Sequence, residues 1–386
     1  MKIALDFAFT LAGGVISYFK EMIRYLSDVD ATNEYLLLVT DDGYEKVCDY
    51  LQKIGIECVV LPRLKNEAYR FLWEQIELPK LLEEKNVDIL YSVNNRVPWK
   101  RTKCKKVVLL GTLGPFMSEF LQHFNYLVRI KQKILARLIA ISLKRADFII
   151  YESEFTRKLI EKKYGDVGHG VVNYHCRPTD FILGEDLSND IIRIRDHYKI
   201  EREYFLYVTY IRRYKNLERL IDAFALIQDN SAKKFDFIAA GPLAPTEKED
   251  YFDQLIRRCT LRGVEGNFRF IGMVQQKDLL PLSLGAFAYV FPSKFENLSY
   301  SLVEALTYGL PIITTMGTAM PETCEDAAIY FEPEDTEGLA NAMISLANKP
   351  KLRETLKAKS IKQAEKFKDM KGEIRTLLDI FNKITQ

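Results

Sequence analysis

Short apolar runs alternate with helical patterns along most of the chain. Runs such as KIALD, EYLLLVT and DILYSV in the first half, and YFLYVTY, FDFIAAG and AFAYVFP in the second, have the length and composition of buried strands. Most are followed by a segment with helical spacing. In residues 217–224, for example, apolar positions recur at i, i+3, i+4 and i+7, and Asn216 before them is a good helix N-cap. This alternation predicts parallel sheets with helices on both faces.

The pattern becomes irregular at residues 174–203 and then restarts. Because 386 residues are too many for one hydrophobic core, we expect two Rossmann-like domains, one over residues 1–175 and one over 176–368. The predicted fold class is therefore α/β, with two doubly wound domains that face each other across a cleft. In such sheets, ligands bind outside the carboxyl ends of the strands.

Composition narrows the class of protein. The sequence begins with a strand-like run instead of a basic and then apolar leader, and no apolar run approaches the roughly 18 residues that cross a bilayer, so we expect a cytoplasmic protein. The six cysteines lack the spacing of a zinc site or a disulfide framework, and no metal site is predicted. Asp28 and Asp30 form an Asp-x-Asp string, but they precede a strand, so we interpret them as a solvated loop.

The charge is distributed unevenly. Residues 96–145 contain twelve Lys or Arg and a single acid, Glu119, a net charge of +11, which leaves −9 on the rest because the whole chain carries +2. An imbalance of this size indicates a partner of opposite charge or a structural reason for the segment.

Residues 120–145 have a helical pattern with two faces. The basic stripe comprises Arg129, Lys133, Arg137 and Lys144, and the apolar side comprises Phe120, Phe124, Leu127, Ile130, Ile134, Leu138 and Ile141. Such a face could lie on an anionic membrane surface, or the helix could pack on the core with a solvated basic rim. Nucleic acid is a weaker alternative, because no recognised binding motif accompanies the charge.

Two glutamates lie in the run FPSKFENLSYSLVEALTYGLPII. An apolar strand ending in Pro292 precedes Glu296, which we place in a loop. Glu304 lies in the first turns of the following helix, which stops at Gly309. The N–H groups at the start of that helix attract anions. Two carboxylates beside a helix start suit a ligand with hydroxyl and phosphate groups, such as a sugar nucleotide.

Three cations follow the strand YFLYVTY. We expect Arg212, Arg213 and Lys215 at the carboxyl edge of the second sheet, where fixed positive charge would stabilise a departing diphosphate, although a basic surface loop is the alternative. Gly13 and Gly14 follow the first strand and open the first helix, where glycine permits a tight turn and close approach of a ligand, although a plain turn is the alternative. Because G-x-G-x-x-G is missing there, a nicotinamide cofactor is unsupported.

Several blocks of the chain resemble the retaining family-4 glycosyltransferases, which have two Rossmann-like domains in the GT-B arrangement. They are FIGMV, VFPSKFEN, SLVEALTYGLPII and MPETCEDAAIYFEPED between residues 268 and 350, and AGGV, WEQIELP, YESEFTRKLI and YKNLERLIDAF elsewhere. The resemblance implies that the first domain receives the acceptor, that the second binds the nucleotide sugar, and that a last helix, about 369–386, crosses back onto the first domain. It also implies metal-independent transfer with retention of anomeric configuration and no cofactor.

The resemblance assigns roles to particular residues. Glu296 would bind the hydroxyls of the donor sugar, Glu304 the ribose, and Lys215 the phosphates together with Arg212 or Arg213. The other donor-binding residues that it implies are Gly13, Gly14, Gly241, Gly272, Met273, Val274, Asn297, Leu298 and Ser299. A phosphate oxygen of the donor can accept the proton of the acceptor, so no protein nucleophile is required.

One departure from the family pattern matters. Gly111 and Thr112 stand where many relatives have a His. Our main prediction is a glycosyltransferase that moves a sugar from a nucleotide sugar to a glycan or lipid-linked glycan in surface polysaccharide or glycoconjugate biosynthesis, with the cytoplasmic membrane face as its candidate location. Two alternatives stay open, an inactive donor-binding scaffold or assembly subunit and a sugar-nucleotide epimerase of the same architecture.

Overall fold

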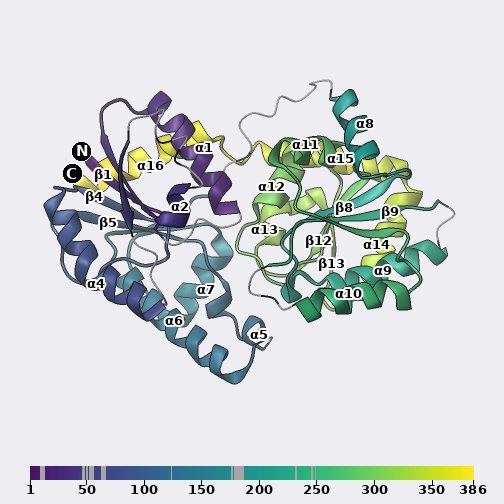
Figure 1. Cartoon of the computed structure of the whole chain (residues 1–386), viewed down its shortest axis with the longest axis horizontal. Coiled ribbons are helices and arrows are strands. Elements are labelled where there is room, and N and C mark those ends of the chain that lie inside the picture. The colour runs from purple at the N-terminus through teal and green to yellow at the C-terminus, as the bar shows by residue number, and fades with distance from the viewer. Residues whose placement is uncertain are drawn as a thin grey trace. The chain divides into compact units, whose positions relative to one another are not determined.

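The computed structural model describes residues 1–8, 14–45, 48, 51, 56–61, 67–122, 124–174, 177, 187–230, 233–244, 247 and 249–386. The chain divides into two compact units, one formed by Met1–Cys176 with Lys368–Gln386 and the other by Arg177–Phe367. Each unit is built on one parallel sheet with helices packed against it (Figure 1). The predicted α/β class with two doubly wound units is confirmed, and the cleft between them stays a prediction.

The sheet of the first unit has the strand order β3-β2-β1-β4-β5-β6-β7, and its neighbouring strands are parallel. The strands are β1 Lys2–Asp6, β2 Glu34–Thr40, β3 Glu57–Leu61, β4 Ile89–Ser92, β5 Lys105–Leu110, β6 Phe148–Tyr151 and β7 Gly170–Val172. The helices are α1 Gly14–Val29, α2 Asp41–Glu45, α4 Glu67–Glu84, η1 Gly114–Phe116, α5 Ser118–Leu121, α6 Tyr126–Arg145, α7 Glu154–Tyr164 and α16 Met370–Thr385. Strands such as β4 are buried throughout, as apolar runs in a sheet covered on both faces should be.

The last helix of the chain completes the first unit. In Figure 1 the yellow α16 lies beside the purple α1, from the opposite end of the chain. Glu373 of α16 accepts hydrogen bonds from the Tyr18 hydroxyl at 3.4 Å and from Asn173 Nδ2 at 2.8 Å, and all three side chains are buried. The ring of Phe381 also packs against that of Tyr91, with centroids 5.8 Å apart. These contacts tie the C-terminal segment to the N-terminal sheet.

The sheet of the second unit has the order β10-β9-β8-β11-β12-β13, again with parallel neighbours. Its strands are β8 Tyr204–Val208, β9 Asp236–Ala240, β10 Phe268–Gly272, β11 Ala288–Phe291, β12 Ile312–Thr315 and β13 Ala328–Phe331. Its helices are α8 Ser188–His197, η2 Arg213–Lys215, α9 Leu217–Asn230, α10 Glu249–Leu261, α11 Gln276–Leu284, α12 Tyr300–Thr307, α13 Met320–Cys324, η3 Glu325–Ala327, α14 Thr336–Asn348 and α15 Pro350–Ala364.

One local prediction was wrong, and another holds for the position of the residue but not for an ordinary N-cap conformation. The helical pattern over 120–145 is divided between α5 and α6, because the Asn125 side chain accepts a hydrogen bond from Val128 N and so caps a new helix. Asn216 precedes α9 as predicted, but it has a left-handed conformation with φ of 62°, and its Nδ2 donates to the Pro333 carbonyl at 2.8 Å. The side chain therefore fixes the loop after β13 to the start of α9.

None of the helices in the described part of the chain is both long enough and apolar enough to cross a membrane.

Candidate functional site

The second sheet changes the direction of its strand order between β8 and β11. Loops that leave two such neighbouring parallel strands diverge, and ligands in doubly wound folds bind in the space between them. Lys215 follows β8 and Glu296 follows β11, so the predicted cation and carboxylate both belong to this point of the sheet.

Lys215 and Glu296 form an ion pair. The distance from Lys215 Nζ to Glu296 Oε1 is 2.5 Å, and the two side chains are 11% and 14% exposed. Lys215 Nζ also lies 5.2 Å from the centre of the Tyr214 ring and 5.5 Å from that of Phe291. The structure thus brings together two residues that are 81 positions apart and that the sequence assigns to one site.

The surroundings keep the Lys215 ammonium protonated. Burial by itself lowers the pKa of Lys215, but the facing Glu296 carboxylate and the Tyr207 and Tyr214 side chains outweigh it, and the pKa is raised. Burial likewise raises the pKa of Tyr207, to about 12, so this phenol stays neutral. A fixed cation at neutral pH suits the binding of a diphosphate.

Glu296 is held by its backbone as well as by its side chain. Its N–H donates to Thr318 Oγ1 at 3.0 Å, and Thr318 itself has a left-handed φ of 48°. Beneath the pair, the Tyr207 and Ser293 hydroxyls lie 2.8 Å apart, and both residues are fully buried. The sequence analysis missed Tyr207, Ser293 and Thr318, because an apolar strand and a loop threonine give no signal of a supporting hydrogen bond.

The two arginines have different surroundings. Arg213 donates from its backbone to Glu247 at 3.2 Å, and its guanidinium lies 4.4 Å from the centre of the Tyr251 ring. Arg212 Nη1 donates to the Tyr214 hydroxyl at 3.4 Å, whereas its buried Nε has no hydrogen-bond partner among the described residues. Among the described residues, the Arg212 guanidinium thus contacts Tyr214, whereas Arg213 contacts Glu247 and Tyr251.

Glu304 lies in α12, as predicted, and is half buried. It contributes to the raised pKa of Tyr289, for which burial is the main cause. Tyr289 packs against Tyr207 with ring centroids 6.4 Å apart. A series of buried tyrosines thus extends from beneath the Lys215–Glu296 pair toward Glu304. Asn297 and Leu298 are buried in the loop before α12, and Ser299 is the residue from which the helix starts.

The glycines of the site differ in what they require. Gly241, at the end of β9, has a φ of +134°, and a Cβ there would lie 1.8 Å from the Thr209 carbonyl oxygen. Close packing of two backbones explains this glycine without a ligand. Gly272 has a φ of +69° with open space around it, and after it Met273 is exposed and Val274 is buried.

Two predictions concern the first unit. Gly13 lies outside the described residues, and Gly14 is the first residue of α1. At the position of the missing His, the N–H groups of Gly111 and Thr112 both donate to Asn95 Oδ1, at 2.8 and 3.0 Å. A Cβ on Gly111 would lie 2.9 Å from Glu152 Oε1, so a carboxylate occupies part of the space that a side chain at 111 would need.

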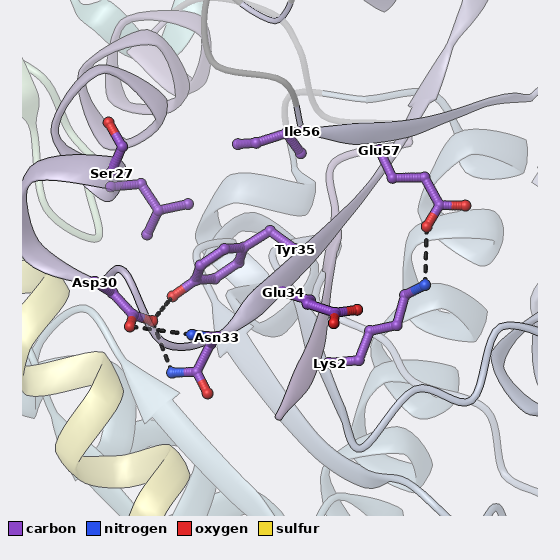
Figure 2. Close-up of a pocket in the computed structure, with 9 residues that line it drawn as sticks. Lys2, Ser27, Asp30, Asn33, Glu34, Tyr35, Ile56 and Glu57 are labelled. Carbon is purple, nitrogen blue, oxygen red and sulfur yellow. Dashed lines mark hydrogen bonds and ion pairs between the residues drawn. The ribbon is translucent and has the colours of Figure 1, made fainter.

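A pocket of about 320 Å³ in the first unit lies at the wrong end of the sheet to be a ligand site. Lys2, Glu34 and Glu57, which begin β1, β2 and β3, line it together with Asp30 and Tyr35 (Figure 2). In doubly wound folds, ligands bind at the opposite end of the sheet, outside the carboxyl ends of the strands.

The prediction that Asp30 lies in a solvated loop was wrong. It is only 8% exposed and accepts hydrogen bonds from Asn33 and Tyr35 (Figure 2) and from Thr32, so it is a buried turn residue and not a solvated one. Burial opposes its ionisation, but these hydrogen bonds outweigh burial and lower its pKa.

A family model matches part of the second unit. Residues 190–363 match the family described as glycosyl transferases group 1. The chain is 24% identical to O-antigen chain mannosyltransferase B of Escherichia coli over 226 residues, which are 58% of each chain. It is 23% identical to mannosylfructose-phosphate synthase of Agrobacterium fabrum over 368 residues, 86% of this chain and 78% of that protein. The resemblance to glycosyltransferases is confirmed.

The match to some curated relatives is partial. The chain spans 58% of the mannosyltransferase B sequence and 32% of the serotype-specific mannosyltransferase WbdA of Escherichia coli, to which it is 25% identical over 276 residues.

Solved structures share the fold over the whole chain. HepE of Anabaena in complex with UDP and glucose has a TM-score of 0.77 at 17% identity, covering 99% of this chain and 100% of that one. A glycosyltransferase of Rickettsia africae has a TM-score of 0.77 at 14% identity, covering 100% and 98%. These likenesses confirm the predicted fold of two Rossmann-like domains.

Proposed function

We propose that the protein is a glycosyltransferase that moves a sugar from a nucleotide sugar to a glycan or lipid-linked glycan in the synthesis of a surface polysaccharide or glycoconjugate. The ion pair of Lys215 and Glu296 at the switch point of the second sheet is the observation that carries the proposal. It joins a group that binds phosphate to a group that binds hydroxyls. The family match over residues 190–363 supports the same conclusion.

In the proposed mechanism, Lys215 and Arg212 bind the diphosphate and stabilise the negative charge that develops as it leaves. Glu296 accepts hydrogen bonds from hydroxyls of the donor sugar, and Glu304 from the ribose. The backbone of residues 297–299 and the first turn of α12 meet the phosphates and the sugar.

We further propose that transfer retains the anomeric configuration and needs no metal. The acceptor hydroxyl attacks from the face of the leaving group through an oxocarbenium-like state, and a donor phosphate oxygen takes its proton. No side chain then has to act as nucleophile, and the charge on the diphosphate is balanced by the two basic side chains.

The experiment that tests this function is a panel of UDP-, GDP- and ADP-sugars, assayed for hydrolysis and for thermal stabilisation of the protein. The names of the curated relatives favour mannose-bearing donors as the first to try. Slow release of nucleoside diphosphate from one donor supports the transferase. Stabilisation without turnover, with or without acceptor, would support the inactive scaffold, and an epimerised nucleotide sugar would identify the third alternative.

The acceptor is proposed to be membrane-linked because of the outer face of α6. Ala136, Ile139, Ala140 and Leu143 pack in the core of the first unit, so the apolar side predicted from the sequence is not the core side. The larger apolar side chains left exposed on α6 are Tyr126, Leu127, Ile130, Ile134 and Ile141. Lys131 and Arg145 flank them on one side, and Lys133 and Lys144 on the other. An apolar strip between rows of cations is suited to an anionic membrane surface.

Sedimentation with vesicles tests this surface. We expect the protein to bind vesicles containing phosphatidylglycerol at low salt and the double substitution Ile130→Ser and Ile134→Ser to weaken binding, since both side chains are exposed and the fold does not need them. Donor hydrolysis should be unchanged in this variant. Equal binding of both proteins, or no binding of the wild type, would contradict the membrane proposal.

A further inference from the structure

A second pocket of the first unit, about 500 Å³ in volume, lies on the inner flank of α6. It is enclosed by the segment from η1 to α5, by the first half of α6 and by the end of α7. The polar and basic side chains that line it include Ser118, Gln122, Arg129, Lys133, Arg137 and Lys163. Four of these are cations, and none of the residues that line the pocket is acidic.

Two of the cations are fixed by the protein. Arg129 donates through Nε to the Phe124 carbonyl at 2.7 Å, and Lys163 donates through Nζ to the Phe116 carbonyl at 2.9 Å. Both bonds leave the positive charge without a carboxylate. They hold one cation on each of two helices that line the pocket, α6 and α7.

The other two cations have no such bond. Among the described residues, neither Lys133 nor Arg137 has a hydrogen bond or an ion pair. The acids next in sequence to the pocket residues Ser118 and Lys163 are engaged, since Glu119 accepts from the Ser118 hydroxyl at 3.0 Å and Glu161 pairs with Arg157 at 3.0 Å. The four positive charges around this cavity repel one another. An anion with several oxygens would attract all four and so offset that repulsion.

We propose that this pocket binds a diphosphate group, and that the diphosphate belongs to the lipid-linked acceptor. The volume accommodates two phosphates, and arginine binds phosphate oxygens through two parallel hydrogen bonds. Ile130 and Ile134 lie next to Lys133 and Arg137 on the surface of α6, so a chain attached to a bound diphosphate would meet exposed apolar side chains. That the ligand is a lipid rests on the proposed function, whereas that it is an anion rests on the pocket alone.

The test is calorimetric titration of the full chain at low salt with two probes, farnesyl diphosphate and inorganic pyrophosphate. We expect each probe to bind this pocket, separately from any binding at the proposed diphosphate site of Lys215 and Arg212, with farnesyl diphosphate the tighter at the pocket. The double substitution Lys133→Gln and Arg137→Gln should weaken both by about tenfold or more, because two charge-assisted contacts are lost. Lys131→Gln is the matched control: it removes a charge from the same helix but does not line the pocket, and its effect should be less than about twofold.

Three results would overturn the inference. If neither probe binds the wild type, the pocket is not an anion site. If Lys131→Gln weakens binding as much as the double variant, the attraction is diffuse and the pocket has no special role. If pyrophosphate binds as tightly as farnesyl diphosphate, the ligand is a free phosphate compound and not a lipid. Because no donor is present in this assay, failure of donor hydrolysis would contradict the proposed function separately.

Discussion

Replacing the two members of the Lys215–Glu296 pair, singly and together, separates the catalytic role of the pair from its structural one. The substitutions are Lys215→Met, which keeps an unbranched chain against the Tyr214 and Phe291 rings, and Glu296→Gln, which keeps the shape of the carboxylate. Each single change leaves one charge without its partner at a site where the side chains are only 11% and 14% exposed.

The expected costs follow from this burial. Loss of one partner of a buried pair destabilises a protein by about 3–5 kcal/mol, and the residual exposure of both groups places each single variant near the lower end, about 3 kcal/mol. Replacing both residues leaves no unpaired charge, so the unfolding free energy of the double variant should lie within about 1 kcal/mol of that of the wild type. Stability is therefore strongly non-additive.

Activity should not recover with stability. If Lys215 stabilises the leaving diphosphate and Glu296 binds the sugar, each single variant should lose about 10²–10³-fold in kcat for donor turnover, and the double variant should be at least as impaired. Urea unfolding gives the stabilities, and release of nucleoside diphosphate at saturating donor gives kcat. A double variant that regains both stability and turnover would refute the reasoning, because the pair would then serve the fold alone.

Three further predictions follow from the same site. Gly241→Ala should lower the unfolding free energy by more than about 2 kcal/mol, because its Cβ would lie 1.8 Å from the Thr209 carbonyl oxygen. The control Gly263→Ala, at a position with a φ of +66° and open space, should lower it by about 1 kcal/mol. Equal urea midpoints for the two variants would contradict this prediction. The pKa of Lys215 is raised in the folded protein, so the contribution of its charge to stability is complete below the unfolded pKa of about 10.4 and is lost as pH rises through the folded pKa. The difference in unfolding free energy between wild type and Lys215→Met should therefore be constant from about pH 6 to 9 and shrink at higher pH. A difference that shrinks already at about pH 8 would be inconsistent with the raised pKa. Donor turnover should persist in excess EDTA, and the anomeric proton of the product should have the configuration of the donor by NMR; loss of activity restored by Mg²⁺, or an inverted product, would contradict the proposed chemistry.

Much of the architecture could be predicted from the sequence, because apolar residues recur with different spacing in strands and in helices, and the two kinds of segment alternate along this chain. The proximity of Lys215 and Glu296 could be anticipated in part, since both follow strands of one parallel sheet and the carboxyl ends of such strands share an edge. Which strands are neighbours could not be read from spacing. The different surroundings of Arg212 and Arg213 could not be predicted from the sequence either, because they depend on where Glu247 and Tyr251 lie.

The errors have physical causes. Helix α6 carries apolar residues on more than one side, and spacing alone cannot tell that Ala136, Ile139 and Ala140 pack inward while Ile130 and Ile134 stay exposed. A single capping side chain interrupts the pattern at Asn125, which periodicity does not detect. Buried polar groups were missed for a related reason, since hydrogen bonds from distant residues satisfy them.

A crystal structure with a bound nucleotide sugar would test the central claim most directly. The account predicts that the diphosphate lies beside Lys215 Nζ and the Arg212 guanidinium, with sugar hydroxyls on Glu296 and the ribose near Glu304. A donor bound elsewhere, or a Lys215–Glu296 pair that touches no part of the donor, would contradict it.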